Sequence, residues 1–217
     1  MHPRWEAPYE PMEKKVLITI GREFGSGGKA VASAISKRLG IPVYDQELLE
    51  NAARKSGLSP EFLERSDERR HLFSLGGLLN SGRFWHNNNN VLDDNELFRI
   101  QSETILDLAQ KGSAIFVGRA SDYVLRDQHA LDVFVCAPLE ARKARVAERR
   151  GITLEEAETL IHKKDKGRRE YYNLLTFGEN WGVAANYDLC IDSSILGIDG
   201  TAELIIHFGK EAGFIPE

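Results

Sequence analysis

The sequence predicts an α/β fold, a three-layer sandwich with a central parallel sheet of about five strands. Its apolar runs are short, which is typical of strands that are buried on both faces. Helical patterns that end at glycine lie between these runs. The first run leads through a glycine-rich turn and a helix into a second run, and this strand–helix–strand order implies a parallel sheet.

The chain opens with one strand–helix–strand unit. The apolar, β-branched run at 16–20 (VLITI) predicts a buried strand that stops at Gly21. Apolar residues then recur at helical spacing over 31–39, and Gly40 is a typical C-terminal stop. Residues 41–44 predict the second strand.

Residues 46–111 predict a mostly helical region that includes an insertion. The asparagine tract 87–90 predicts a loop within it, because Asn competes with the backbone for hydrogen bonds. The pattern Asp93-x-x-Glu96 resembles a capping box, so we expect a helix to begin there and to end before Gly112.

The second half of the chain predicts three more strands and three more helices. We expect strands at 114–117, 131–137 and 187–191. We expect helices from Pro138 to Arg150, after a capping box formed by Thr153 and Glu156, and from 202 to 212.

The length favours one domain, since a domain commonly holds about 150 residues. We expect a loose N-terminal arm over 1–14 and a single domain over 15–217. The longest apolar runs hold about five residues, against the roughly 20 that a membrane-spanning helix needs. Residues 1–15 lack the apolar stretch of a signal peptide, and two cysteines are too few for a disulfide scaffold. We therefore expect a cytoplasmic protein.

The charge distribution points to a small polyanion as the ligand. A formal net charge of −5 argues against nucleic acid or an anionic membrane as the main partner. Residues 142–169 nevertheless carry ten basic and five acidic side chains. Such a block indicates a local polyanion, such as the phosphates of a nucleotide, and a solvated helix with ion pairs is the alternative.

The turn GREFGSGGK, residues 21–29, lies between the first strand and the first helix. Its glycines let backbone N–H groups form an anion nest, the helix adds the positive end of its dipole, and Lys29 can reach the β- and γ-phosphates. Two residues depart from the pattern G-x-x-x-x-G-K-[ST]: Glu23 replaces the first glycine, and Ala30 replaces the hydroxyl residue. We favour a phosphate loop over the alternatives, a packing-driven turn and a dinucleotide loop.

Two further residues follow predicted strands at the carboxyl edge, where open α/β sheets bind ligands. Asp45 could accept hydrogen bonds from a base or a sugar, or could be the N-cap of the helix that begins at Gln46. Arg119 suits bidentate recognition of a phosphate, and the alternative is a surface arginine that pairs with Asp122.

The segment KKDKGRR, residues 163–169, lies on the helix after the turn at Gly151. Arginines on such a helix–turn–helix can close over a nucleotide, exclude water and neutralise charge that moves off the γ-phosphate. Some of these lysines can equally be present because cations stabilise the C-terminal end of a helix.

We expect the histidines, the cysteines and the aromatic residues of the insertion to have structural rather than catalytic roles. The six histidines show no metal-ligand spacing, so we expect no protein-bound metal site. Cys136 and Cys190 are interpreted as structural. Phe73, Phe84 and Trp85 are interpreted as packing residues of the insertion rather than as a base-stacking platform.

With these residues in view, the chain resembles the cytidylate kinase-like family of P-loop nucleoside monophosphate kinases. The resemblance covers most of residues 16–205. It is carried by the segments ITIGREFGSGGKAVASAISKRLGIPVYDQELL, IFVGRASDYVLRD, VFVCAPLEARKARVAERRGIT, KKDKGRREYY and YDLCIDSS.

The resemblance implies a P-loop kinase fold with a helical monophosphate-binding region at 46–111 and a lid at 149–172. It also implies roles for individual residues. The donor phosphates of ATP would be held by Gly25, Ser26, Gly27, Gly28, Lys29 and Ala30. The acceptor would be held by Asp45, Arg119, Asp165 and Arg168. Phosphoryl transfer would be assisted by Lys29, Arg149, Arg150 and Arg168.

The implied activity is ATP- and Mg²⁺-dependent phosphoryl transfer to a nucleoside monophosphate, with CMP or dCMP as the first acceptor to expect. Three places differ from the cytidylate kinases proper: Ala30-Val31 after the lysine, Gln46-Glu47 after Asp45, and Ala120 after Arg119. Two alternatives therefore remain open, a kinase of another small metabolite and a nucleotide-binding regulatory module without catalysis.

Overall fold

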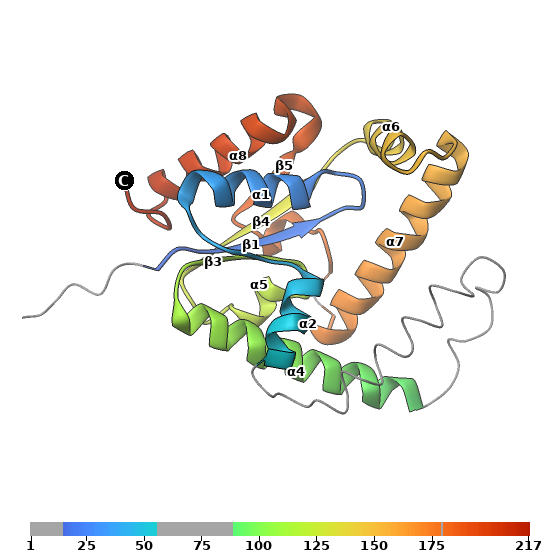
Figure 1. Ribbon diagram of the computed structural model, residues 1–217. Coiled ribbons are helices and arrows are strands. Elements are labelled where there is room, and N and C mark those ends of the chain that lie inside the picture. The colour runs from blue at the N-terminus through green and yellow to red at the C-terminus, as the bar shows by residue number, and fades with distance from the viewer. Residues whose placement is uncertain (1–14, 56–88, 179) are drawn as a thin grey trace, which may run out of the picture.

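The computed structural model describes residues 15–55, 89–178 and 180–217. Its centre is a five-stranded sheet in which all described pairs of strands are parallel, with the order β2-β3-β1-β4-β5. The strands are β1 (Leu17–Arg22), β2 (Val43–Tyr44), β3 (Ala114–Val117), β4 (Ala130–Cys136) and β5 (Leu189–Asp192). The predicted three-layer α/β sandwich is confirmed (Figure 1).

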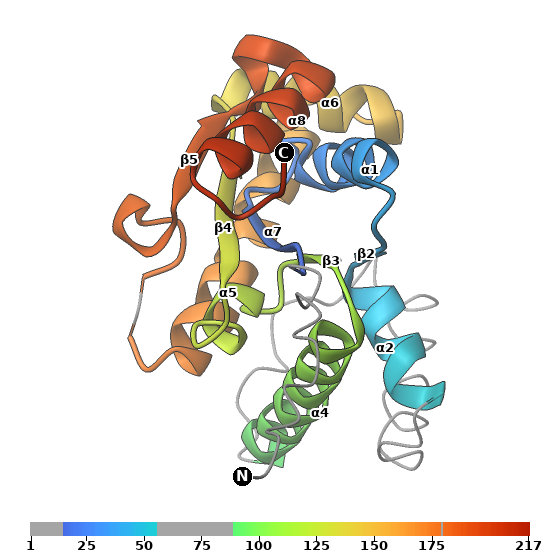
Figure 2. The same cartoon turned by 90° about the vertical axis from the view of Figure 1, so that its left-hand side faces the viewer.

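The helices of the described residues cover both faces of the sheet and one of its ends. They are α1 (Gly28–Leu39), α2 (Gln46–Lys55), α4 (Asn89–Lys111), α5 (Ser121–Val124), α6 (Leu139–Arg150), α7 (Leu154–Leu175) and α8 (Ser193–Glu211). Helices α1 and α8 lie side by side on one face, and α4 and α5 lie on the other (Figures 1 and 2). Helices α6 and α7 project beyond the end of the sheet at which β1 meets α1 (Figure 1).

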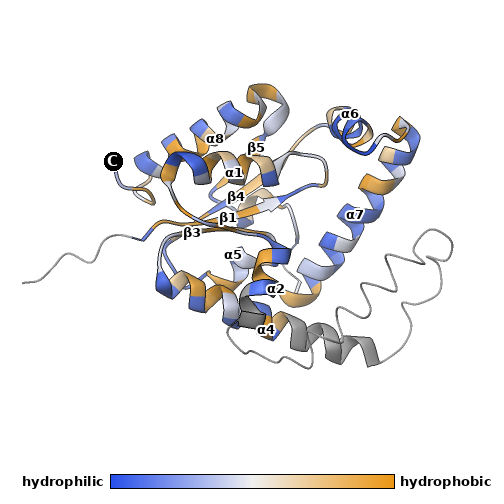
Figure 3. Ribbon diagram, in the orientation of Figure 1, coloured by the Kyte–Doolittle hydropathy of each residue, from blue (hydrophilic) through white to orange (hydrophobic). Residues whose placement is uncertain are grey.

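The strand β1 contributes to a core on each side of the sheet. Ile18 and Ile20 are fully buried in the cluster beneath α1 and α8, whereas Leu17 packs with Phe116 in the cluster beneath α4 and α5. Successive strand residues point to opposite faces, which is why a sheet covered on both sides reads as a continuous apolar run. In Figure 3 the strands of the sheet are largely apolar, whereas helix α6, which lies beyond the end of the sheet, is largely hydrophilic.

Several predicted helix ends are confirmed. Gly40 and Gly151 follow α1 and α6 in the left-handed conformation, with φ of 68° and 65°. Thr153 and Glu156 form the predicted capping box of α7, since each side chain accepts a hydrogen bond from the other residue's backbone N–H.

Three predicted boundaries are wrong. β1 continues through Gly21 to Arg22, because the ladder with β4 extends to these two residues. α4 begins at Asn89, within the tract expected to be a loop, and not at Asp93. α8 begins at Ser193 rather than at 202, because the carboxylate of Asp192 accepts the N–H of Ser194 and caps the helix. The helix is kinked at Gly197.

The expected N-terminal arm at 1–14 and the aromatic residues Phe73, Phe84 and Trp85 lie outside the described residues. Among the described helices, none combines the length and the apolar character that crossing a membrane requires.

Candidate functional site

The carboxyl ends of the strands bring four predicted site segments together. Because the strands are parallel, the residues that follow β1, β2 and β3 all lie at one edge of the sheet. These are the loop 23–27, Asp45, and the pair Gly118–Arg119. Helix α7 contributes Asp165 and Arg168 to the same edge, where both contact the β1 end or its loop.

The loop 23–27 leaves a row of backbone N–H groups without a partner. Gly25 and Gly27 have φ of 84° and 87°, a region that favours glycine. The N–H groups of Phe24 and Ser26 are hydrogen-bonded. Among the described residues, no partner lies within hydrogen-bond reach of the N–H groups of Gly25, Gly27, Gly28, Lys29 and Ala30. The first turn of α1 follows at once, so these donors and the helix dipole fit a polyphosphate.

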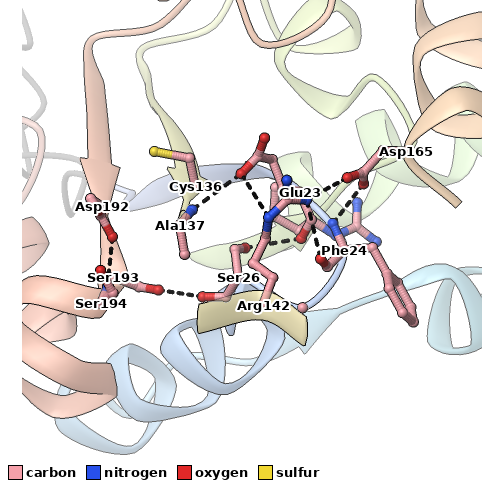
Figure 4. Close-up of polar contacts among 12 residues, drawn as sticks. Glu23, Phe24, Ser26, Cys136, Ala137, Arg142, Asp165, Asp192, Ser193 and Ser194 are labelled. Atoms are coloured by element: carbon pink, nitrogen blue, oxygen red, sulfur yellow. Dashed lines mark hydrogen bonds and ion pairs between the residues drawn. The ribbon is translucent and has the colours of Figure 1, made fainter. Parts of the chain in front are cut away.

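The carbonyl groups of the loop are fixed by two residues that the sequence analysis missed. Nη1 of Arg145 on α6 donates to the oxygen of Ser26 at 3.0 Å and to that of Gly25 at 3.4 Å. The hydroxyl of Ser193 also donates to the oxygen of Ser26 (Figure 4). In a trans peptide the C=O and N–H point in opposite directions, so these bonds turn the N–H of Gly27 away from Arg145. In the sequence, Arg145 stood out only as one of the ten basic residues of the block 142–169.

Asp165 joins α7 to the loop. Its Oδ1 accepts the N–H of Phe24 at 2.6 Å, and its Oδ2 lies 2.5 Å from Nη1 of Arg142. Glu23, which stands where the standard pattern has glycine, accepts the N–H of Ala137 at 3.1 Å and lies 3.5 Å from Nε of Arg142 (Figure 4). Asp165 was expected to contact the acceptor, but both of its oxygens have protein partners that hold the loop in place.

Lys29 and Asp45 form an ion pair across the edge of the sheet, with 2.5 Å between Nζ and Oδ2. Oδ1 of Asp45 accepts the N–H of Leu48 at 3.1 Å, so Asp45 caps α2, as the alternative interpretation of this residue predicted. Burial acts to raise the pKa of Asp45, but the hydrogen bonds from Lys29 and from the N–H of Leu48 outweigh it and the pKa is lowered.

Arg119 follows β3 in the left-handed conformation, with a φ of 64°. Its guanidinium donates to Oε1 of Gln46 and lies over the ring of Tyr171, with 4.9 Å from Cζ to the ring centroid. Gln46 therefore anchors the arginine that the sequence analysis expected to bind the acceptor phosphate.

The arginines of the expected lid gather around one aromatic ring of the loop. The Cζ atoms of Arg149, Arg150 and Arg168 lie 5.8, 5.7 and 5.4 Å from the centroid of Phe24. The ring also packs against the apolar cluster that joins α6 to α7. Burial lowers the pKa of Arg168. The carboxylate of Asp165, at 3.7 Å, opposes this effect, and the guanidinium groups of Arg119 and Arg142 add to it.

The loop 23–27 and the first turn of α1 offer hydrogen-bond donors that suit phosphate groups. No group of three or more His, Cys, Asp or Glu side chains among them could hold a metal ion. The exposed Ala30 offers no hydroxyl at the start of α1. Mg²⁺ commonly keeps several waters and takes few protein ligands, so this arrangement is compatible with an ion held mainly by phosphate oxygens.

The sheet order and the glycine-rich strand-to-helix loop define the P-loop kinase class of fold, and the relatives described next identify the chain as a phosphotransferase. The chain belongs to the cytidylate kinase-like family, which its residues 17–195 match. It is 28% identical over 200 residues to the cytidylate kinase of Methanopyrus kandleri, with 88% of this chain and 91% of that protein covered. It is 25% identical over 193 residues to the cytidylate kinase of Pyrococcus horikoshii, with 88% and 86% covered.

Solved structures give the same fold. An uncharacterized protein from Eubacterium ventriosum has a TM-score of 0.68 at 26% identity, covering 89% of this chain and 98% of that one. Shikimate kinase from Acinetobacter baumannii has a TM-score of 0.51 at 14% identity, covering 92% and 96%. The second likeness concerns the fold alone.

Proposed function

We propose that this protein transfers the γ-phosphoryl group of ATP to a nucleoside monophosphate, with CMP or dCMP as the preferred acceptor. The observation that carries the proposal is the ion pair between Lys29 and Asp45. It connects the glycine-rich loop, which suits the donor phosphates, to the end of β2, where the acceptor is expected. Membership of the cytidylate kinase-like family supports nucleotide kinase activity.

On this proposal the unpaired N–H groups of the loop and the ammonium of Lys29 bind the donor phosphates. Arg119 binds the acceptor phosphate, and Asp45 bonds to the acceptor once Lys29 has turned to ATP. Arg149, Arg150 and Arg168 offset charge on the transferring group and exclude water. Asp165 is a positioning residue, since it holds Phe24 and Arg142.

In the transfer, an oxygen of the acceptor phosphate forms a bond to the γ-phosphorus, and the bond from that phosphorus to the bridging oxygen of ADP breaks. The protein's part is to position the two phosphates and to stabilise charge. Mg²⁺ bound to the donor phosphates would neutralise part of that charge.

A nucleotide-binding module without turnover is the second candidate, and Ala30 is the observation that favours it. Phosphate loops commonly place a Ser or Thr hydroxyl on Mg²⁺ at this position. A kinase that acts on another small metabolite is a variant of the first candidate with the same loop and lid.

A coupled assay of ADP release over a panel of nucleoside monophosphates, with calorimetry of Mg²⁺–ATP binding, tests these functions. We expect acceptor-dependent turnover that is fastest with CMP or dCMP. ATP binding without turnover on any monophosphate would reject the main proposal. A screen of small metabolites would then separate the metabolite kinase from the regulatory module.

A further inference from the structure

The side chain of Arg22 connects two loops of the site. Arg22 is the last residue of β1 and pairs with Val135 of β4. Its Cβ lies beside the start of α1, since an ideal Cβ built at Gly28 would be 2.7 Å away. Its guanidinium lies against Gly118, where an ideal Cβ would overlap Nη1 and come within 2.7 Å of Cζ. Because residues 28 and 118 are glycines, the Arg22 side chain has room to extend from the start of α1 to the end of β3.

The backbone of Arg22 is fixed by a second arginine of the site. Nη1 of Arg168 on α7 donates to the carbonyl oxygen of Arg22 at 3.0 Å. This bond brings Arg168 to the end of β1, and Arg119 follows Gly118 directly in the chain. Three guanidinium groups therefore meet at the ends of β1 and β3.

The half-buried guanidinium of Arg22 has like charges as its main neighbours. Burial, Arg168 and Arg119 lower its pKa to about 9, and Asp45 alone acts in the opposite direction. Asp45 is already bound to Lys29, and no hydrogen bond or ion pair joins the Arg22 side chain to any other described residue. A cation buried among cations is costly, and a bound anion would remove that cost.

We propose that Arg22 binds the phosphate group of the acceptor, as a third guanidinium beside Arg119 and Arg168. The proposal rests on the proposed function and adds a substrate-binding residue to it. The charged end of Arg22 lies at Gly118, on the acceptor side, whereas only the first carbons of the side chain lie at Gly28. A guanidinium can donate two parallel hydrogen bonds to a phosphate.

This assignment also restricts the class of acceptor. Arg168 lies 3.7 Å from Oδ1 of Asp165, whereas no ion pair joins Arg22 or Arg119 to a carboxylate among the described residues. A phosphate dianion would give these two guanidinium groups a counterion, and an acceptor that offers only a hydroxyl would not. The site therefore selects phosphate monoesters.

The test compares full-length Arg22→Gln with the wild-type protein by calorimetric titration of CMP, inorganic phosphate and Mg²⁺–ATP. We expect about ten-fold or greater weakening for CMP and phosphate, as for loss of a charged hydrogen-bond partner, and less than about two-fold for ATP. Arg38→Gln is the matched control, because Arg38 lies in the last turn of α1, at the opposite end of that helix from the loop, and its side chain pairs with Asp199 and Glu203 on α8. It should change none of the three affinities.

Unchanged CMP and phosphate affinities in Arg22→Gln would overturn the proposal. Equal loss of ATP affinity would also overturn it, because Arg22 would then face the donor. The proposal would also be overturned if the wild-type protein bound neither CMP nor inorganic phosphate. If Arg22→Gln does not fold, Arg22→Lys replaces it, and we expect a smaller weakening for CMP and phosphate with ATP unchanged.

These outcomes are separable from failure of the proposed function. Binding of inorganic phosphate that depends on Arg22 does not require turnover, so it would stand even if no monophosphate were a substrate. Conversely, normal turnover with unchanged affinities in Arg22→Gln would reject the role of Arg22 and leave the kinase function intact.

Discussion

Lys29, in the first turn of α1, lies 2.5 Å from Asp45 at the end of β2, and the two side chains differ in exposure. The lysine side chain is 71% exposed and the aspartate side chain 13%. The ammonium is therefore on the solvent side of the pair, where an arriving polyphosphate can compete for it. The pair gives Lys29 a counterion and holds the ammonium and the carboxylate at the same edge of the sheet.

Lys29→Ala should reduce acceptor-dependent turnover by a factor on the order of 10² or more, as for the loss of one preorganised charge-stabilising donor. The fold should be retained, because the side chain is exposed. ADP-release kinetics and thermal unfolding measure the two effects. Lys37→Ala on the exposed last turn of the same helix is the control and should keep full activity. An unchanged rate in Lys29→Ala would mean that Lys29 does not contact the phosphates.

Arg145→Ala should weaken ATP binding by about ten-fold, since charged hydrogen bonds contribute roughly 1.5–3 kcal/mol. The carbonyls of Gly25 and Ser26 lose the donor that orients the loop. Calorimetry with a non-hydrolysable ATP analogue measures the change. Lys143→Ala on the same helix removes a cation that pairs with Glu140 and Glu158, and it should leave the affinity unaltered. Equal effects of the two variants would contradict the orienting role.

Ala30→Thr should lower the Mg²⁺ concentration for half-maximal activity by about two- to five-fold, because it supplies the hydroxyl that phosphate loops place on the ion. Ala30 is exposed, so the larger side chain has room. Ala30→Val has nearly the same shape without the hydroxyl and serves as the matched control. The prediction fails if both variants shift the Mg²⁺ dependence alike.

Asp132→Asn should stabilise the protein near pH 7 by about 1–3 kcal/mol. Asp132 lines a hollow of about 350 Å³ beside α5, where burial raises the pKa of its carboxyl to about 6. Thr19 donates to its Oδ1 at 2.6 Å, which lowers the pKa only in part, and an Asn oxygen can accept that bond equally.

The sign of this pH effect follows from the raised pKa of Asp132. Between pH 4 and the native pKa of about 6, the native state keeps a proton that the unfolded state has lost, so the free energy of unfolding falls as pH rises. Denaturant unfolding from pH 4 to 8 measures this slope, which Asp132→Asn should reduce. Asp127→Asn, with a side chain 84% exposed, is the control. An unaltered slope in Asp132→Asn would locate the pH dependence elsewhere.

The sheet and the chain segments at its edge were predictable because they depend on local patterns. The buried strand before residue 21, the left-handed stop at Gly40 and the capping box at Thr153 all follow from residues within a few positions of each other. The start of helix α4 was predicted four residues too late, because intrinsic propensities such as that of Asn for turns are weak determinants of where a helix begins.

The amino-acid sequence alone predicts the order of strand, glycine-rich turn, helix and basic helix pair, and hence the kinase class of fold. Which charged groups meet depends on how the folded chain packs. Asp165 bonds to Phe24, 141 positions away, and Arg145 bonds to Ser26, 119 positions away. Arg22 reaches Gly118 only because β1 and β3 are neighbours in the sheet. Spacing along the chain carries no information on such pairs, because the packing of whole strands and helices sets the distances between them.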